Sequence, residues 1–298
     1  MTGPLDLETL REWGRLYSNW GRWGAGDELG TLHFITPERV LAAASLPRSG
    51  AVISCALPFD AGVPGEAGSP HAPVHDGEGE PSPLPAPHGA GARWVALCHV
   101  SYDGLAYNER AVTQLPIHGA RAGSIDRLAS GVVGRGVLLD LPRAFGVPWL
   151  EDGQRIGPAD LDACAEASGV TVETGDVLLV RTGRMTRAFA EGAWGGYAGG
   201  PSPGLSVRCA RWLHERQIAA VATDSWCVEV IPHELDDCPM PLHQIAVRDI
   251  GLLFGESFHL DPLAEACAQD GRHAFLFVAA PLPSSAALGS PINPLAIK

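Results

Sequence analysis

The sequence lacks the features that mark several large classes of protein. Its 298 residues contain no Cys-x-x-Cys pair, no internal repeat and no apolar run approaching the ~20 residues of a membrane-spanning helix. The first residues, Met1 to Asp6, have neither the charged region nor the apolar region of a signal peptide. We therefore expect a cytoplasmic protein that has no contact with a membrane.

Positive charge is scarce as well. The chain has 21 Lys and Arg against 34 Asp and Glu, a formal net charge of −13, and the charges form neither a basic block nor an acidic tail. Nucleic acids and anionic membranes bind to concentrated positive patches, so we expect neither as a partner. A small organic molecule, neutral or weakly charged, is the expected substrate.

Seven cysteines are present, and an odd number cannot all pair within one chain. We expect reduced thiols, as in cytosolic proteins. They are Cys55, Cys98, Cys164, Cys209, Cys227, Cys238 and Cys267.

The composition and length predict one large globular domain. Hydrophobic residues make up 46% of the chain and charged residues 18%, and a chain of this length buries roughly three quarters of its unfolded surface. We assign residues 36–298 to this domain and residues 1–35 to an N-terminal arm. The arm has helical spacing over 5–16 and then Trp20 and Trp23 among glycines, which either pack on a partner subunit or form a pocket wall. Residues 60–92 are predicted to be a long Pro/Gly-rich loop.

Apolar strands alternate with helices along the rest of the chain, which indicates an α/β sheet covered on both faces. Thr36-Pro37 predicts a helix start, with Thr36 as the N-cap. The expected strands are 51–57, 94–100, 136–141, 176–183, 219–224 and 274–279, and the expected helices are 36–44, 124–128, 158–168 and 206–217.

Five segments, taken in order, carry a resemblance to a known family. They are 19–24 with 27–32, 96–104 with 107–108, 175–183, 223–226, and 241–243 with Glu256. Together they resemble the putative cyclase family, the superfamily of kynurenine formamidase and isatin hydrolase. The resemblance implies a swivelling β/β/α fold with a mixed, barrel-like sheet flanked by helices, and a homodimer or homotetramer. In typical members it implies a divalent-metal hydrolase that opens an amide or lactam.

The metal-binding signature of that family is degenerate in this chain. The pattern His-x-Gly-Thr-His-x-Asp, with a further His four residues on, keeps only Gly91 and the last histidine, His99. The other ligand positions fall on Gly89, Arg93 and Val95. Glycine and valine have no side-chain donor, and the arginine keeps its positive charge. If the loop were shifted by one residue against the signature, His88 would take the first ligand position. The metal site would still be incomplete.

A second cluster is better preserved, since His99, His243 and Glu256 match the residues that approach the second metal in the family. Two interpretations are open. The three side chains hold one Zn or Mn ion with an open position, or they are a metal-free acid/base group beside Arg93, whose guanidinium takes the place of the cation. We favour the metal-free interpretation, in which no cofactor is needed, because the aspartate of the signature is absent.

The leading functional hypothesis is a cyclase or dehydratase that acts on a small aromatic or heterocyclic molecule in specialised metabolism. His99 is the predicted general base, His243 and Glu256 orient it or return the proton, and Arg93 stabilises an oxyanion. The predicted substrate-binding residues are Trp20, Trp23, Tyr102, Arg181, Asp224 and Trp226. The alternatives are a metal-dependent amide or lactam hydrolase and a non-catalytic pseudohydrolase.

Several of these residues also have a structural interpretation. His99 is a hydrogen-bonded core histidine in that case, and Arg93 is a surface charge at a strand end. Tyr102 belongs to a turn before Gly104 or lines the pocket. Arg181 and Asp224 end neighbouring apolar strands, at the edge of the sheet where α/β proteins commonly bind ligands.

Overall fold

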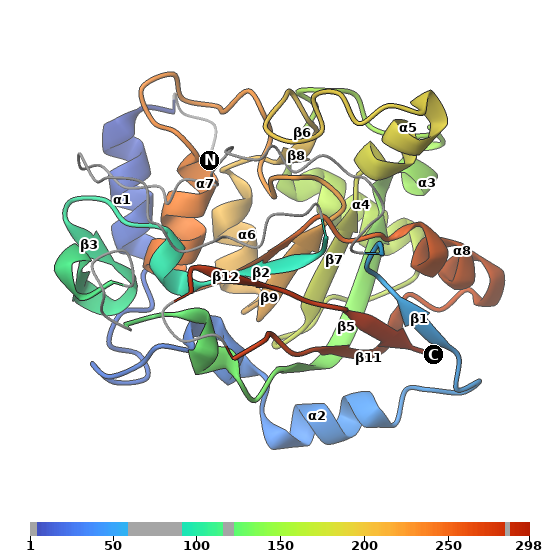
Figure 1. Ribbon diagram of the computed structural model, residues 1–298, viewed down its shortest axis with the longest axis horizontal. Helices are drawn as coiled ribbons and strands as arrows, with labels where there is room; N and C mark the ends of the chain where they lie inside the picture. Colours follow the sequence, from blue (N-terminus) through green and yellow to red (C-terminus); the bar gives the residue numbers. More distant parts are fainter. Residues whose placement is uncertain (1–4, 59–90, 116–121, 284–286) are drawn as a thin grey trace.

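A curled mixed sheet forms the centre of the molecule. The computed structural model describes residues 5–58, 91–115, 122–283 and 287–298. Within these residues the main sheet has nine strands in the order β1-β13-β11-β5-β7-β9-β10-β2-β12 (Figure 1). Their bounds are β1 Val52–Ser54, β2 Arg93–Val95, β5 Val132–Asp140, β7 Val177–Arg181, β9 Ala220–Thr223, β10 Leu253–Glu256, β11 Ala274–Ala279, β12 Gly289–Pro291 and β13 Leu295–Ile297. Two-stranded pairs join β3 (Leu105–Ala106) to β4 (Arg110–Ala111) and β6 (Arg155–Ile156) to β8 (Gly204–Leu205).

The middle of the sheet is parallel and its two sides are antiparallel. Strands β5, β7, β9 and β10 run in one direction, so their carboxyl ends share one edge. Strand β11 pairs with β5 and β2 pairs with β10, both antiparallel. Parallel strands need crossover connections, and helices supply them. The α/β class and the barrel-like mixed sheet predicted from the sequence are confirmed.

The sheet separates two hydrophobic cores, which explains why its strands are apolar without alternation. Val137, Leu178 and Val221 point into one core, whereas their neighbours Leu138 and Leu179 point into the other. A strand that is covered on both faces excludes polar residues from both.

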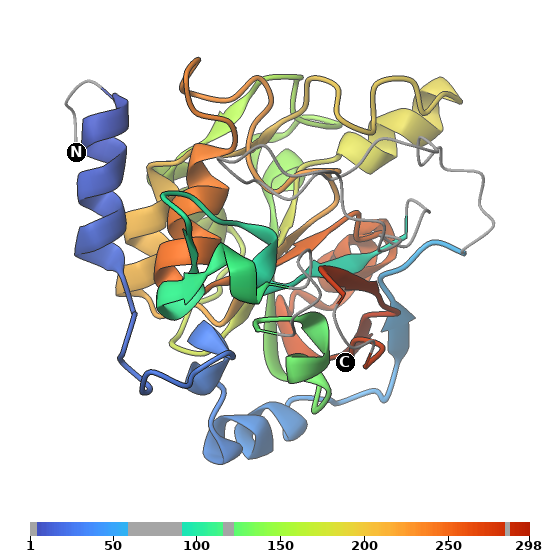
Figure 2. The ribbon, with the colours of Figure 1, turned by 60° about the vertical axis from the view of Figure 1, so that its left-hand side comes forward.

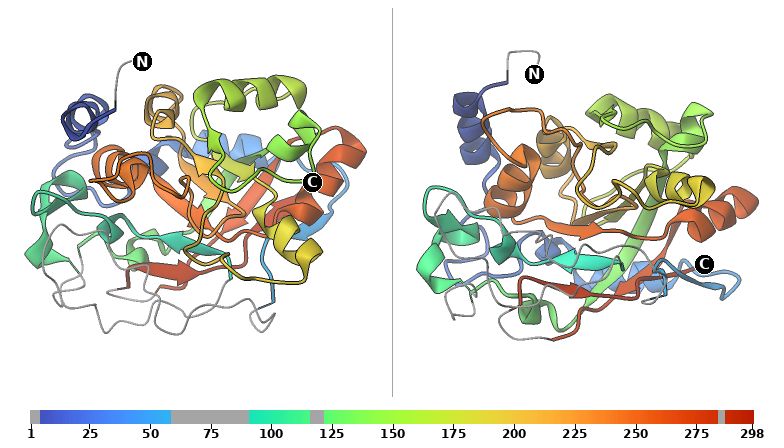
Figure 3. Two further views of the ribbon diagram at one scale, coloured as in Figure 1. Left: turned by 90° about the horizontal axis from the view of Figure 1, so that it is seen from above. Right: turned by 45° about the horizontal axis from the view of Figure 1, so that its top comes forward.

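Helices cover both faces of the sheet. Their bounds are α1 Leu7–Tyr17, α2 Pro37–Ala44, α3 Leu141–Phe145, α4 Pro158–Ala167, α5 Arg184–Glu191, α6 Cys209–Glu215, α7 Pro241–His243 and α8 Asp261–Asp270. Helix α1 lies beside α6 and beside the π-helix Gln244–Ile250, which continues α7 (Figures 2 and 3). Helices α1, α4 and α6 bury residues in the first core, and α8 buries Leu263 and Cys267 in the second.

The helix of the N-terminal arm packs on its own chain. Leu10, Trp13 and Tyr17 on α1 are buried in the first core, and the Asp6 carboxylate caps the helix by accepting from the Thr9 N–H. That the arm also packs on a second copy of the chain stays a prediction. Most of the predicted loop 60–92, namely residues 60–90, lies outside the described residues. Among the residues that are described, no helix is both long enough and apolar enough to cross a membrane.

One predicted element was wrong in kind, and a second is a tighter helix than an α-helix. The predicted strand 94–100 ends at Val95, where pairing with β10 stops, and Leu97–His99 forms a 3₁₀ turn closed by a bond from His99 N to Ala96 O. The short helix predicted at 124–128 is present as a single turn of 3₁₀ helix, Ile125–Leu128, with Ser124 as its N-cap. Single-turn 3₁₀ segments carry little periodicity for a sequence pattern to detect.

Candidate active site

The register of the sheet places Arg93 opposite Glu256. The two residues are cross-strand partners in the antiparallel pair of β2 and β10. Both Nε and Nη2 of Arg93 face one oxygen of Glu256, Oε2, at 3.1 and 2.8 Å. The Glu256 side chain is 1% exposed and that of Arg93 is 11% exposed. Glu256 therefore has the cation that a buried carboxylate needs.

Two further residues hold the Arg93 guanidinium in place. Its Nη2 donates to the carbonyl oxygen of Trp226 at 3.0 Å, and the guanidinium lies over the Trp226 ring, 4.2 Å from its centre. Its Nη1 donates to the hydroxyl of Ser257 at 3.3 Å. Ser257 has a φ of 57°, a left-handed conformation that a non-glycine residue adopts at a cost and that concentrates at functional sites. The strained turn after β10 thus directs a hydroxyl at Arg93.

A second carboxylate, Glu229, fixes His243. Helix α7 begins at Pro241, two residues before His243. The Glu229 carboxylate accepts hydrogen bonds from the backbone N–H groups of Leu242 and His243 at 3.1 and 3.0 Å. The same carboxylate is hydrogen-bonded to His243 Nδ1. A carboxylate at a helix N-terminus compensates otherwise unpaired N–H groups. Glu229 therefore sets both the start of the helix and the orientation of the imidazole.

His243 joins the two carboxylates into one buried network. Its Nε2 lies 3.6 Å from Glu256 Oε1, and its ring meets Phe254 edge-on with 4.8 Å between ring centres. Burial lowers the pKa of His243, but hydrogen bonds to Glu229 and Glu256 outweigh it and raise the pKa to about 9. The imidazole is then protonated at neutral pH and presents Nε2–H as an acid.

The charges of this network balance within the protein. Arg93 and protonated His243 supply two positive charges, and Glu229 and Glu256 supply two negative charges. Cys227 adds a buried thiol, whose pKa burial raises well above its usual value. Among the described residues, Cys227, His243 and Glu256 have ligand atoms within 4.8 Å of one another.

His99 is outside that group of three. It follows β2 on the 3₁₀ turn and its side chain is buried, 6% exposed. Four of the predicted residues therefore lie together in the structure: Arg93, His243, Glu256 and Trp226. His99 lies on the 3₁₀ turn that follows β2.

Two other predicted residues, Trp20 and Tyr102, meet at a different place, around Arg248. The indole N–H of Trp20 donates to the Arg248 carbonyl at 2.8 Å, and the Arg248 guanidinium lies over both rings. The Tyr102 hydroxyl donates to Asp249 at 2.6 Å. Trp23 instead stacks on His33, with 5.0 Å between ring centres. Trp20 and Tyr102 thus brace α1 and the π-helix after His243.

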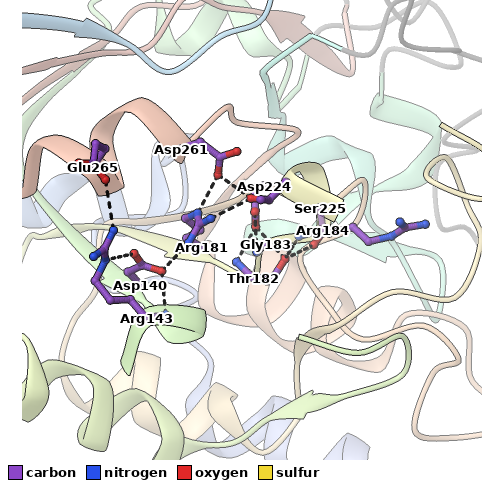
Figure 4. A network of polar contacts seen from close by, with 11 residues as sticks. Asp140, Arg143, Arg181, Thr182, Gly183, Arg184, Asp224, Ser225, Asp261 and Glu265 are labelled. Atoms are coloured by element: carbon purple, nitrogen blue, oxygen red, sulfur yellow. Dashed lines mark hydrogen bonds and ion pairs between the residues drawn. The ribbon is translucent and has the colours of Figure 1, made fainter. Parts of the chain in front are cut away.

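Arg181 and Asp224 belong to a polar network at the carboxyl ends of β5, β7 and β9 (Figure 4). Arg181 forms ion pairs with Asp140 at 2.7 Å and with Asp261 at 2.8 Å. The Asp224 carboxylate accepts the N–H groups of Thr182 and Gly183 at 2.6 and 2.8 Å. Burial raises the pKa of Asp224 to about 6. These contacts hold the strand ends together next to Trp226.

Sequence analysis did not identify three residues of the site: Cys227, Glu229 and Ser257. The signal for Glu229 was a lone acid between Val228 and Val230, since a carboxylate in an apolar run needs a partner. The sequence carries no signal for Ser257, because its contact with Arg93 depends on the left-handed backbone conformation of the residue.

The signature residues do not fit the divalent ion that the resemblance implies. At two of the ligand positions stand Arg93, whose guanidinium pairs with Glu256, and Val95, which has no donor atom. A guanidinium at bonding distance from a would-be ligand repels a dication. The remaining positions, Gly89 and the neighbouring His88, lie outside the described residues.

Comparisons with known proteins confirm the resemblance. A crystal structure described as a novel cyclase is 30% identical, covers 96% of this chain and 99% of its own, and superposes with a TM-score of 0.80. An isatin hydrolase bound to the product analogue thioisatinate is 18% identical over 82% of this chain and 91% of its own, with a TM-score of 0.54. Isatin hydrolase A from Ralstonia solanacearum is 16% identical over 99% and 98%, with a TM-score of 0.55. The two isatin hydrolases show a shared fold, and no curated protein matches the chain. A family model described as putative cyclase matches residues 54–230, more than half of the sequence, and the chain therefore belongs to the putative cyclase family.

Proposed function

We propose that the chain is a metal-independent enzyme that closes or rearranges a ring in a small aromatic or heterocyclic substrate by proton transfer and loss of water. Family membership indicates an enzyme of the cyclase or hydrolase kind. The observation that carries the finer proposal is the Arg93–Glu256 ion pair, which puts a fixed positive charge at a ligand position of the metal signature.

Proton transfers in the proposed reaction are divided between two histidines. His99 takes a proton from the nucleophilic group of the substrate, and a ring bond forms at the carbon that carries the departing hydroxyl. Protonated His243 gives its Nε2 proton to that hydroxyl, which leaves as water. A histidine whose pKa is about 9 starts the reaction in the acid form, and its hydrogen bond to Glu229 holds the ring in place.

Arg93 stabilises the negative charge that develops on an oxygen of the substrate. Guanidinium groups donate fixed hydrogen bonds in a known direction, and a preorganised donor costs no reorganisation during the reaction. Trp226, 8% exposed, contributes apolar surface that keeps water from the dehydrating step. Trp20, Trp23, Tyr102, Arg181 and Asp224 remain predicted substrate-binding residues, and their contacts above favour supporting roles for Trp20, Tyr102, Arg181 and Asp224.

A mass-resolved substrate screen tests this proposal. Chelator-treated protein is incubated with hydroxylated aryl and heteroaryl precursors and with aryl amides and lactams, and the products are followed by mass spectrometry. The proposal expects loss of the mass of one water, abolished in His243→Gln and in Arg93→Met. A product that has gained the mass of one water, and that forms only after Zn²⁺ or Mn²⁺ is added back, contradicts it.

Metal-dependent opening of an amide or lactam is the second candidate. It is favoured by the fold shared with the isatin hydrolases and by the donor atoms of His243 and Glu256 within one buried group. Activity that survives exhaustive chelation rules it out.

A further inference from the structure

We propose that Arg184 anchors a carboxylate group of the substrate, so that the enzyme acts on aromatic acids. The inference rests on the proposed function, because it concerns the same substrate. Arg184 is the first residue of helix α5, which follows strand β7 after a short turn. It therefore lies at the carboxyl end of the parallel strands, where α/β proteins commonly bind ligands.

The Arg184 side chain is a buried cation without a close partner. It is 6% exposed, and its Nε has no hydrogen-bond partner among the described residues. Its ion pair with Asp152 measures 3.7 Å from Nε to Oδ1, which is too long for a hydrogen bond. Asp152 is 37% exposed and lies closer to Arg187, whose Nη1 is 3.2 Å from Oδ2. Since a buried donor without an acceptor is unfavourable, a ligand that accepts hydrogen bonds from Arg184 would supply what the chain does not.

The neighbouring arginine at this end of the sheet is paired differently. Arg181 donates to Asp140 and to Asp261 at 2.7 and 2.8 Å, and so it ties strand ends to helix α8. In Figure 4, the guanidinium of Arg184 is directed away from the Asp224 carboxylate and from the rest of the labelled network. The network that holds the strand ends therefore does not explain why Arg184 is buried.

A row of aromatic rings leads from Arg184 to the proposed active site. The Arg184 guanidinium lies 5.7 Å from the centre of the Tyr197 ring. Tyr197 meets Trp194 and Trp226 edge-on, with 5.2 and 6.4 Å between ring centres, and Trp226 contacts the Arg93 guanidinium. Aromatic side chains bind a further ring through edge and face contacts. A substrate whose carboxylate is held by Arg184 would thus have its ring directed along this row toward Arg93.

The glycine-rich loop after α5 leaves space beside the guanidinium. Among the described residues, a Cβ added at Gly196 would meet only Arg184 Nη2, at 3.9 Å, and one added at Gly195 or Gly199 would meet nothing within 4 Å. Glycines allow a ligand to approach the backbone closely. A carboxylate suits this place better than a phosphate, because its single charge and two oxygens match one guanidinium and because Asp152 repels a dianion more strongly.

Fluorine NMR titration with two matched probes tests the proposal. Chelator-treated protein is titrated with para-fluorobenzoate and with para-fluorobenzamide, which share a ring and differ in charge. The benzoate should bind the wild type more tightly than the benzamide does. Arg184→Met should weaken benzoate binding by roughly tenfold or more, because charge-assisted hydrogen bonds are lost, and should leave benzamide binding unchanged. Arg187→Met removes the arginine one turn further along α5 and is the matched control, which should bind both probes as the wild type does.

Two results would overturn the proposal: equal binding of the two probes by the wild type, or unchanged benzoate binding in Arg184→Met. An equal loss in Arg187→Met would also overturn it, since the effect would then come from general charge. If Arg184→Met does not fold, as judged by circular dichroism, Arg184→Gln takes its place with the same expected outcomes. The titrations involve no turnover. A protein that binds the benzoate through Arg184 and releases no water from any substrate therefore supports this inference and contradicts the proposed reaction.

Discussion

Arg93 and Glu256 stand opposite each other on adjacent antiparallel strands, and Nη2 of the arginine lies 2.8 Å from Oε2 of the glutamate. In the family signature, residue 93 is a metal-ligand position. Its replacement by a permanent cation turns a position that would bind a metal into one that makes an ion pair with a buried carboxylate.

The ion pair of Arg93 and Glu256 should contribute strongly to the free energy of unfolding. Replacing Arg93 by Met or Glu256 by Gln removes one partner, and loss of one partner of a buried pair costs about 3–5 kcal/mol. The double variant should lose less unfolding free energy than the two single variants lose together, because neither charge is then buried without its partner. Urea unfolding of the four proteins measures this. Additive losses would show that the two side chains do not interact.

Stability should fall at alkaline pH because of His243. Its pKa is raised from 6.5 to about 9 in the folded protein, so its contribution is fully present below about pH 6.5 and is lost as pH rises through 9. A shift of this size corresponds to roughly 3 kcal/mol. Unfolding free energies between pH 6 and pH 10 measure the loss, and Glu229→Gln, which weakens the cause of the shift, should flatten the curve. An unchanged curve in Glu229→Gln would show that another group causes the loss.

Asp224 should act through the backbone that it holds. Its carboxylate accepts from Thr182 N, Thr182 Oγ1 and Gly183 N, so Asp224→Ala leaves buried donors without a partner. We expect a loss of about 2–4 kcal/mol in unfolding free energy. Asp224→Asn retains an acceptor oxygen and should lose less. Equal losses in the two variants would contradict this account of the carboxylate.

Gly255 should tolerate no side chain. A Cβ there would lie 2.6 Å from the Trp94 ring and 2.9 Å from the Ala222 side chain, because β10 packs tightly beside the ion pair. Gly255→Ala should destabilise the protein by about 1–3 kcal/mol. Gly26→Ala, where nothing lies within 4 Å, is the matched control and should be near neutral. Thermal unfolding compares the two, and equal midpoints would refute the packing argument.

The sequence predicts the strands of this fold well where they are long and apolar. Strands β5, β7, β9 and β11 lie where the apolar runs predict them, because both faces of the sheet are covered. Strand β10 was missed, since it is short and includes Gly255 and Glu256. The 3₁₀ turn that carries His99 was also missed, because its three residues show no period.

The site was predictable only in part. Arg93, His243 and Glu256 could be chosen as candidates from the sequence because family motifs mark their positions. Their pairing depends on the register of β2 against β10, which a single sequence does not specify. Glu229 was missed because its role depends on helix α7, whose His243 lies fourteen residues further along the chain.

Metal analysis of the wild-type protein tests the central claim most directly. The protein is produced in medium supplemented with zinc and manganese, purified without chelator, and measured by inductively coupled plasma mass spectrometry. Because Arg93 occupies the Glu256 carboxylate, the account predicts far less than one divalent ion per chain. One tightly held zinc or manganese ion per chain, lost in His243→Ala or Glu256→Ala, would contradict it.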